Sequence, residues 1–192
     1  MNLPNKLTTM RILLVPLMVA ALLIPFPLHN LVALALFGAA SLTDLFDGKI
    51  ARKRGLITDF GKFADPLADK ILVISTLLCF VQLGLCDCVA VIIILFREFT
   101  VTSIRLIAAA KGKVIAANIL GKVKTVTQIV ALICVMVMQI VLDLGGLGVP
   151  LPDGLSTVFY WIGEALIWIS TFFALLSGVI YIKQNKQFIA DM

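Results

Sequence analysis

The sequence predicts an all-α integral membrane protein, a single domain of residues 1–192 with six transmembrane helices and a short N-terminal amphipathic juxtamembrane helix. Three observations indicate this fold class. The 192 residues are 61% hydrophobic and only 14% charged, with a mean hydropathy of +1.09. Several apolar stretches approach or exceed the roughly 18 residues that a helix needs to cross a bilayer. These stretches lack the polar–apolar alternation of a β-barrel, and backbone in lipid must satisfy its own hydrogen bonds, which favours helices.

The helices are placed by their apolar runs and by the turn residues between them. We expect helices over residues 10–28, 30–52, 62–84, 88–109, 118–142 and 156–182, with residues 1–9 as a lead-in on the membrane surface. The successive breaks fall at Pro25 and Pro27, at Gly55, at Gly84, at Gly112 and in the glycine-rich run 145–150.

Basic residues gather at one end of these helices. Lys and Arg occur near the start of the first helix, around residues 49–70, around residues 105–124 and in the C-terminal tail, whereas the other three connections contain none. By the positive-inside rule we expect both termini and the basic loops in the cytoplasm, at the plasma membrane. The same charge attracts anionic lipids, and no nucleic-acid partner is expected.

Four aspartates stand out against this background. Asp44 and Asp47 lie near the end of the second predicted helix, and Asp65 and Asp69 near the start of the third. The spacings i, i+3 and i, i+4 place each pair on one helix face. A connection of about nine residues lets the two helices lie antiparallel, so that the four carboxylates face one another. The simpler alternative is that these are helix-end carboxylates paired with lysines of the same region, namely Lys49, Lys62 and Lys70.

Carboxylates at membrane depth are costly, roughly 2.5–3.5 kcal/mol each, unless their charge is compensated. A set of oxygen ligands without His or Cys suits Mg²⁺, Mn²⁺ or Ca²⁺. A two-metal site of this kind clamps a diphosphate. Gly48 and Ala51 leave space beside it, and Arg52 can meet a phosphate or a base edge. Two alternative functions would also use these aspartates, namely an intramembrane prenyltransferase and a cation transporter. Transporters usually contain internal repeats, and we find none in this sequence.

The aspartates belong to a longer pattern, Asp44-x-x-Asp47-Gly48-x-x-Ala51-Arg52, then eight residues, then Gly61-x-x-x-Asp65-x-x-x-Asp69. This pattern resembles the signature of the CDP-alcohol phosphotransferase family at every fixed position. Further segments extend the resemblance over nearly the whole chain, among them residues 2–5, 97–99 and 121–125. They are similar to the branch of that family that makes phosphatidylglycerol phosphate.

The resemblance implies a six-helix membrane enzyme, usually a homodimer, that displaces CMP from a CDP-linked donor with an alcohol. It implies that Asp44, Asp47 and Asp65 are ligands of Mg²⁺ or Mn²⁺, in two ions, and that Asp69 lies close to the metals and acts as general base. Gly48, Ala51, Arg52 and Gly61 would line the donor pocket. For this branch the donor would be CDP-diacylglycerol and the acceptor sn-glycerol 3-phosphate. Relatives within the family use inositol phosphate, serine or another lipid as acceptor.

Several residues outside the signature are open to two interpretations. A dianionic acceptor needs cations, and Arg105, Lys122 and Lys124 lie at the cytoplasmic helix ends, where topology alone also favours Lys and Arg. Arg97 and Glu98 interrupt the fourth helix and form either an internal pair or part of the site. The N-terminal arm offers three residues that either contact the nucleotide or anchor the chain at the interface: Asn5, Thr8 and Arg11.

Overall fold

A computed structural model of the protein describes residues 3–54, 59–113, 115 and 119–186. Within these ranges the side chains of residues 3–8, 44–54, 59–66, 69 and 110 lie outside the description. The described residues form six α-helices and no strand: α1 (Leu3–Leu23), α2 (His29–Arg54), α3 (Asp59–Gln82), α4 (Cys88–Ala110), α5 (Ile119–Gly146) and α6 (Leu155–Gln184).

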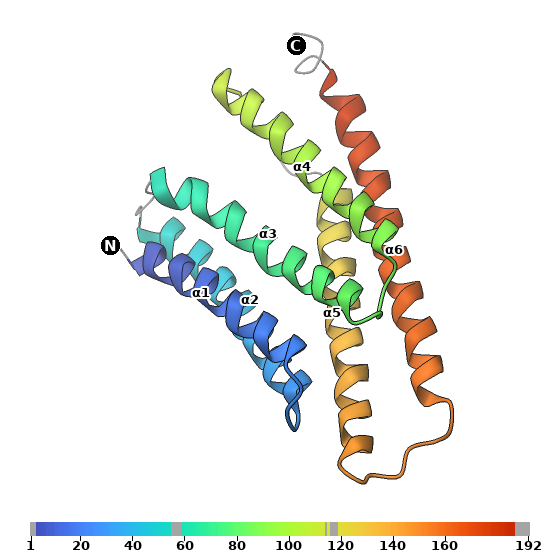
Figure 1. The fold of residues 1–192 in the computed structure, drawn as a ribbon. Coiled ribbons are helices and arrows are strands. Elements are labelled where there is room, and N and C mark those ends of the chain that lie inside the picture. The colour runs from blue at the N-terminus through green and yellow to red at the C-terminus, as the bar shows by residue number, and fades with distance from the viewer. Residues whose placement is uncertain (1–2, 55–58, 114, 116–118, 187–192) are drawn as a thin grey trace.

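The helices alternate in direction, because each connection is short (Figure 1). The start of α1, the ends of α2 and α4 and the end of α6 therefore lie on one side of the molecule, which is the basic side of the sequence. The connections α1–α2 and α5–α6 lie on the opposite side, at the bottom of Figure 1. α1 packs on α2 and α3, and α6 packs on α4 and α5.

The juxtamembrane helix predicted over residues 1–9 is not a separate element. From Leu3 onward these residues form the first turns of α1, which continues through Pro16. The predicted end at residue 28 is also wrong, because the helix stops at Leu23. Pro25 and Pro27 explain the earlier stop, since a proline lacks the N–H of a helical residue and restricts the residue before it.

The connection between α2 and α3 is shorter than the predicted nine residues. α2 extends to Arg54 and α3 begins at Asp59, so that only residues 55–58, which lie outside the described residues, join them. α4 agrees with the prediction, and it begins at a cap in which Asp87 Oδ1 accepts a hydrogen bond from the backbone N–H of Val89 at 2.9 Å. α5 runs four residues beyond its predicted end at 142.

The interior holds one main apolar cluster and several buried polar side chains. Met18, Phe37, Phe80, Leu132 and Ile167 are almost completely buried in the cluster, which joins all six helices. The interior also contains buried polar side chains, namely Arg11, Thr76, Lys124, Gln128, Ser170, Thr171 and Ser177.

At the end opposite to the basic side, a polar contact ties α2 to α5. The Asn30 side-chain amide donates to both carboxylate oxygens of Asp143 at 3.1 Å. His29 lies beside this pair, with Nε2 3.6 Å from Asp143 Oδ1. The contact fixes the outer ends of the two helices relative to each other.

The outer surface is apolar. Large hydrophobic side chains are exposed on several helices, including Leu13 on α1, Phe96 on α4 and Phe172 on α6, each more than 60% exposed. Such a surface is typical of contact with lipid. Within the described part of the chain, α5 and α6 are long and apolar enough to cross a membrane. α4 is comparable in length but carries Arg97, Glu98 and Arg105.

Candidate active site

The four aspartates lie on the two helices that the sequence predicted. Asp44 is ten residues before the end of α2 at Arg54, and Asp69 is ten residues after the start of α3 at Asp59. In an antiparallel pair joined by a short connection, these positions fall at about the same depth, roughly 15 Å from the helix ends at 1.5 Å per residue. Asp47 and Asp65 lie nearer the connection on the same two helices.

The side chains of all four aspartates lie outside the described residues, as do those of the residues predicted to bind the donor: Asn5, Thr8, Gly48, Ala51, Arg52 and Gly61. Their backbones are helical, in α1, α2 or α3. Among the side chains that the structure does describe, no three of His, Cys, Asp and Glu are close enough to hold a metal ion.

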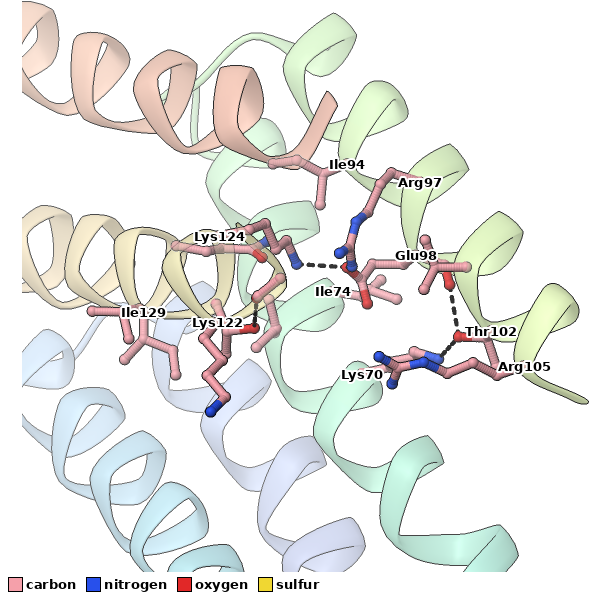
Figure 2. Close-up of a pocket in the computed structure, with 16 residues that line it drawn as sticks. Lys70, Ile74, Ile94, Arg97, Glu98, Thr102, Arg105, Lys122, Lys124 and Ile129 are labelled. Atoms are coloured by element: carbon pink, nitrogen blue, oxygen red, sulfur yellow. Dashed lines mark hydrogen bonds and ion pairs between the residues drawn. The ribbon is translucent and has the colours of Figure 1, made fainter. Parts of the chain in front are cut away.

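A cavity of about 610 Å³ lies between α3, α4 and α5, and Figure 2 shows its lining. Lys70, Val73 and Ile74 line it from α3, so that the cavity begins one residue along the chain from Asp69. The described lining contains five cationic side chains and one carboxylate: Lys70, Arg97, Arg105, Lys122, Lys124 and Glu98. A cavity with this charge is suited to a small anion.

The inner wall of the cavity is a buried network of charged groups. Glu98 Oε1 accepts hydrogen bonds from Arg97 Nη1 at 2.7 Å and from Lys124 Nζ at 2.6 Å. Arg97 Nε donates to Ser177 Oγ at 3.1 Å. The network joins α4, α5 and α6, and the close packing of α6 is possible because residue 178 is glycine, where a Cβ would lie 2.9 Å from Arg97 Cγ. Of the two interpretations of Arg97 and Glu98, the internal ion pair is therefore confirmed, and the same residues also line the cavity.

Arg105 lies about two turns further along α4, towards the basic end. Its Nε donates to the Tyr181 hydroxyl at 3.3 Å, and its guanidinium lies 5.6 Å from the centre of the Tyr181 ring. These contacts hold the guanidinium at the cavity wall. Between Arg105 and Glu98, Lys70 Nζ donates to Thr102 Oγ1, a contact that joins α3 to α4.

Lys122 is exposed, as is Arg105, and in Figure 2 the Lys122 ammonium extends away from Glu98 and Lys124. The structure thus brings Arg105, Lys122 and Lys124 to one cavity, although Lys124 already has Glu98 as a partner. An ammonium has three N–H donors, so this contact leaves Lys124 further donors for a ligand.

Arg11 is more deeply placed than the sequence indicated. Its side chain is fully buried, which contradicts an interfacial anchor. Thr76 Oγ1 on α3 lies 3.4 Å from Met18 Sδ on α1, and these two helices run in the same direction. Arg11 and Asp69 each lie seven residues before these contacting positions and therefore share one level. The residues around Arg11 in the sequence gave no indication of this register.

Gln128, Ser177 and Tyr181 also border the site. The family resemblance includes Gln128, which follows Lys124 by four residues and shares its helix face. The position of Tyr181 near a helix end indicated only an interfacial anchor, and Ser177 was not singled out from the sequence. Ser177 and Tyr181 come from α6, whose sequence shows no distinguishing pattern at these positions.

The fold and the residue pattern agree with one family of membrane enzymes. The CDP-alcohol phosphatidyltransferase family model matches residues 1–177, and the chain belongs to this family. The chain is 39% identical to the CDP-diacylglycerol–glycerol-3-phosphate 3-phosphatidyltransferase of Bacillus subtilis, with 96% of this chain and 95% of that protein covered. It is 36% identical to the protein of the same name from Rickettsia bellii, with 97% of each chain covered. A match to the CMP-forming cardiolipin synthase of rice is 35% identical and covers 96% of this chain but 57% of that protein.

Proposed function

We propose that the protein transfers the phosphatidyl group of CDP-diacylglycerol to sn-glycerol 3-phosphate, giving phosphatidylglycerol phosphate and CMP. The names of the Bacillus and Rickettsia relatives support both substrates, since the match covers nearly the whole of each chain. The observation that carries the proposal is the basic cavity, which begins beside Asp69 and is lined by cations from three helices.

The acceptor phosphate binds in this cavity, to Arg105, Lys122 and Lys124. Arg105 is held in place by Tyr181, and a guanidinium matches phosphate oxygens with two parallel hydrogen bonds. Lys122 is exposed and its ammonium extends away from Glu98, so that it can approach the ligand from α5. Topology alone explains cations at helix ends, but it does not explain why three of them face one cavity beside the signature helices.

The donor lies against α1, α2 and α3. Its diphosphate is held near Asp44, Asp47 and Asp65, and its cytidine end lies against the helix face formed by Gly48, Ala51 and Arg52. Gly61 permits a close backbone approach, and Asn5 and Thr8 add contacts from α1. The lipid tails remain in the bilayer, because the site is only about 15 Å from the helix ends.

Members of this family generally depend on a divalent metal ion. The residues present suit that requirement, because Asp44, Asp47, Asp65 and Asp69 offer oxygen ligands alone, the set that Mg²⁺ and Mn²⁺ prefer. Two ions, when bound, supply positive charge against the diphosphate.

Asp69 takes the proton from the acceptor hydroxyl. An alcohol is a poor nucleophile, and a carboxylate within hydrogen-bond reach raises its reactivity as it attacks. The hydroxyl oxygen forms a bond to the β-phosphorus of the donor while the bond from that phosphorus to the oxygen of CMP breaks. The electron pair of the broken bond leaves with CMP, and the proton remains on Asp69.

The proposed setting is the plasma membrane, crossed six times, with both termini and the site in the cytoplasm. The exposed apolar side chains on α1, α4 and α6 support the crossing, and the Lys- and Arg-free connections support the orientation. Anionic lipids gather at the basic face. The proposed assembly is a homodimer, because the family that the sequence resembles usually forms homodimers.

Family membership sets aside the prenyltransferase and the cation transporter. The alternatives that remain are acceptors used elsewhere in the family. The match to the rice cardiolipin synthase makes a second lipid one of these alternative acceptors, although the aligned region covers little more than half of the rice protein. Arg105, Lys122 and Lys124 favour a phosphorylated acceptor over serine.

The test is CMP release by purified protein in mixed micelles containing CDP-diacylglycerol and Mg²⁺ or Mn²⁺, with each acceptor in turn. We expect release only with glycerol 3-phosphate, and a loss of at least about 100-fold in Asp69→Asn. Asp153→Asn, in the exposed connection before α6, is the matched control and should keep full activity. Release that requires inositol phosphate or serine instead would overturn the proposed acceptor, and full activity of Asp69→Asn would overturn the proposed base.

A further inference from the structure

Glu98 is the one carboxylate among the described residues that line the cavity. A site for a dianionic ligand gains nothing from a negative charge at its wall, because like charges repel. The side chain is nevertheless largely buried, with 15% of its surface exposed, at the boundary between the packed interior and the cavity. Its position therefore calls for a role beyond anion binding.

The two oxygens of Glu98 differ in their surroundings. Oε1 accepts from both Arg97 Nη1 and Lys124 Nζ, which fixes the plane of the carboxylate. The second oxygen has no hydrogen-bond partner within the described part of the chain, and in Figure 2 it points away from Lys124, towards Ile74 on the α3 wall. A carboxylate oxygen in this position is a strong acceptor for a hydroxyl of a bound ligand.

The depth of Glu98 suits a hydroxyl near the reacting end of the acceptor. Lys70, the neighbour of Asp69, contacts Thr102, which lies one turn from Glu98. Arg105 lies about 10 Å from Glu98 along α4, at 1.5 Å per residue. A phosphate bound at the level of Arg105 therefore directs the carbon chain of a three-carbon acceptor along α4 towards Glu98.

We propose that Glu98 binds the acceptor hydroxyl that does not react, and thereby selects an acceptor with a vicinal diol. This inference rests on the proposed placement of the acceptor phosphate at Arg105 and Lys122. Glycerol 3-phosphate has a terminal and a secondary hydroxyl. When the terminal hydroxyl lies at Asp69 as nucleophile, the secondary hydroxyl donates a hydrogen bond to the open oxygen of Glu98. Arg97 and Lys124 act as positioning residues for that oxygen.

The test compares two acceptors that differ by this single hydroxyl, glycerol 3-phosphate and 3-hydroxypropyl phosphate. Both keep the phosphate and the terminal hydroxyl, so contacts with the cations cancel in the ratio of their kcat/KM values. We expect the wild-type protein to favour glycerol 3-phosphate by about 10- to 100-fold, the range that corresponds to one charge-assisted hydrogen bond.

Glu98→Gln should reduce this preference by about tenfold or more. The two cations keep the amide oxygen, which leaves on the cavity side an NH₂ group that donates but cannot accept a hydrogen bond from the ligand hydroxyl. A second variant, Glu98→Leu with Lys124→Met, removes the Glu98–Lys124 ion pair as a unit, a replacement that buried ion pairs often tolerate. Arg97 keeps its contact with Ser177. This second variant should bring the two acceptors within about threefold. The matched control is Glu164→Gln, which should keep the wild-type ratio. Glu164 is a carboxylate on α6 that accepts hydrogen bonds from the backbone N–H of Asp87 and the indole N–H of Trp168.

An unchanged ratio in both Glu98 variants would overturn the inference, because a purely structural role lowers activity with both acceptors equally. Arg105→Met separates this result from a failure of the proposed phosphate site, for which we expect a KM raised at least about tenfold for both acceptors alike. If Arg105→Met leaves both KM values unchanged while the Glu98 variants lose selectivity, the hydroxyl contact stands and the phosphate placement fails.

Discussion

The contact between Glu98 and Lys124 offers a quantitative test of the buried network. A double-mutant cycle compares four proteins: the wild type, Glu98→Gln, Lys124→Met and the double variant. Glu98→Gln keeps the size of the side chain and removes its charge, and Lys124→Met keeps most of the apolar stem. The cycle isolates the energy of the pair from the effects of each substitution on other neighbours.

The structure sets the expected magnitude. The two charged atoms lie 2.6 Å apart, and their side chains are 5% and 15% exposed. In an effective dielectric constant of about 20 the gross attraction is about 6 kcal/mol. Desolvation cancels several kcal/mol of this for each ion, and Glu98 keeps Arg97 as a second partner. We therefore expect a net coupling of about 2 kcal/mol.

The assay is the free energy of unfolding from reversible SDS titration in mixed micelles. Each single variant should lose about 2 kcal/mol, and the double variant should lose about 2 kcal/mol less than the sum of the two. A solvent-exposed pair contributes only about 0.2–1 kcal/mol. A coupling below about 0.5 kcal/mol would contradict a buried ion pair, because it would mean that water screens the two groups from each other.

Three further predictions concern the packing around the site and the outer connection. Gly178→Val should lower the free energy of unfolding by about 1–3 kcal/mol, measured by the same titration, because its side chain meets Arg97; wild-type stability would contradict the packing of α6 on α4. Arg11→Met should lower the free energy of unfolding by about 3 kcal/mol in the same titration, because it removes a buried charged side chain whose surroundings are arranged for that charge. An unchanged free energy of unfolding would contradict the burial of Arg11. Burial raises the pKa of Cys86, in the α3–α4 connection, to about 12. Cys86 therefore stays protonated at pH 8, and Cys88→Ser should remove most maleimide labelling because Cys88 is exposed; rapid labelling of Cys86 at pH 8 would refute this.

Much of the fold was predictable because lipid imposes strong constraints on sequence. The six helices fall close to the apolar runs, and α4 was placed within one residue at its end. Errors arose where local signals were weak. The lead-in of residues 1–9 was expected to be separate, yet nothing in its sequence stops a helix once α1 packs on α2 and α3. Gly55 suggested a long connection, but only four residues join α2 and α3.

The site was predictable only in part. Helical spacing placed Asp44 with Asp47 and Asp65 with Asp69, and a short connection brings their helices together at one depth. Their ligand and base roles remain predictions. The cations were recognised as a group, but Lys70 was assigned to the basic side and to the aspartates and not to the cavity, where its side chain contacts Thr102.

By itself, the sequence determined the lipid-facing helices, the uneven distribution of charge and the signature aspartates, because these depend on composition and on spacing along one helix. The tertiary structure alone decided which helices share a cavity and at what level. The pairing of Glu98 with Lys124, the contact of Arg97 with Ser177 and the burial of Arg11 are examples. Each depends on the register between helices distant in sequence, which is set by packing over their whole length rather than by any local pattern.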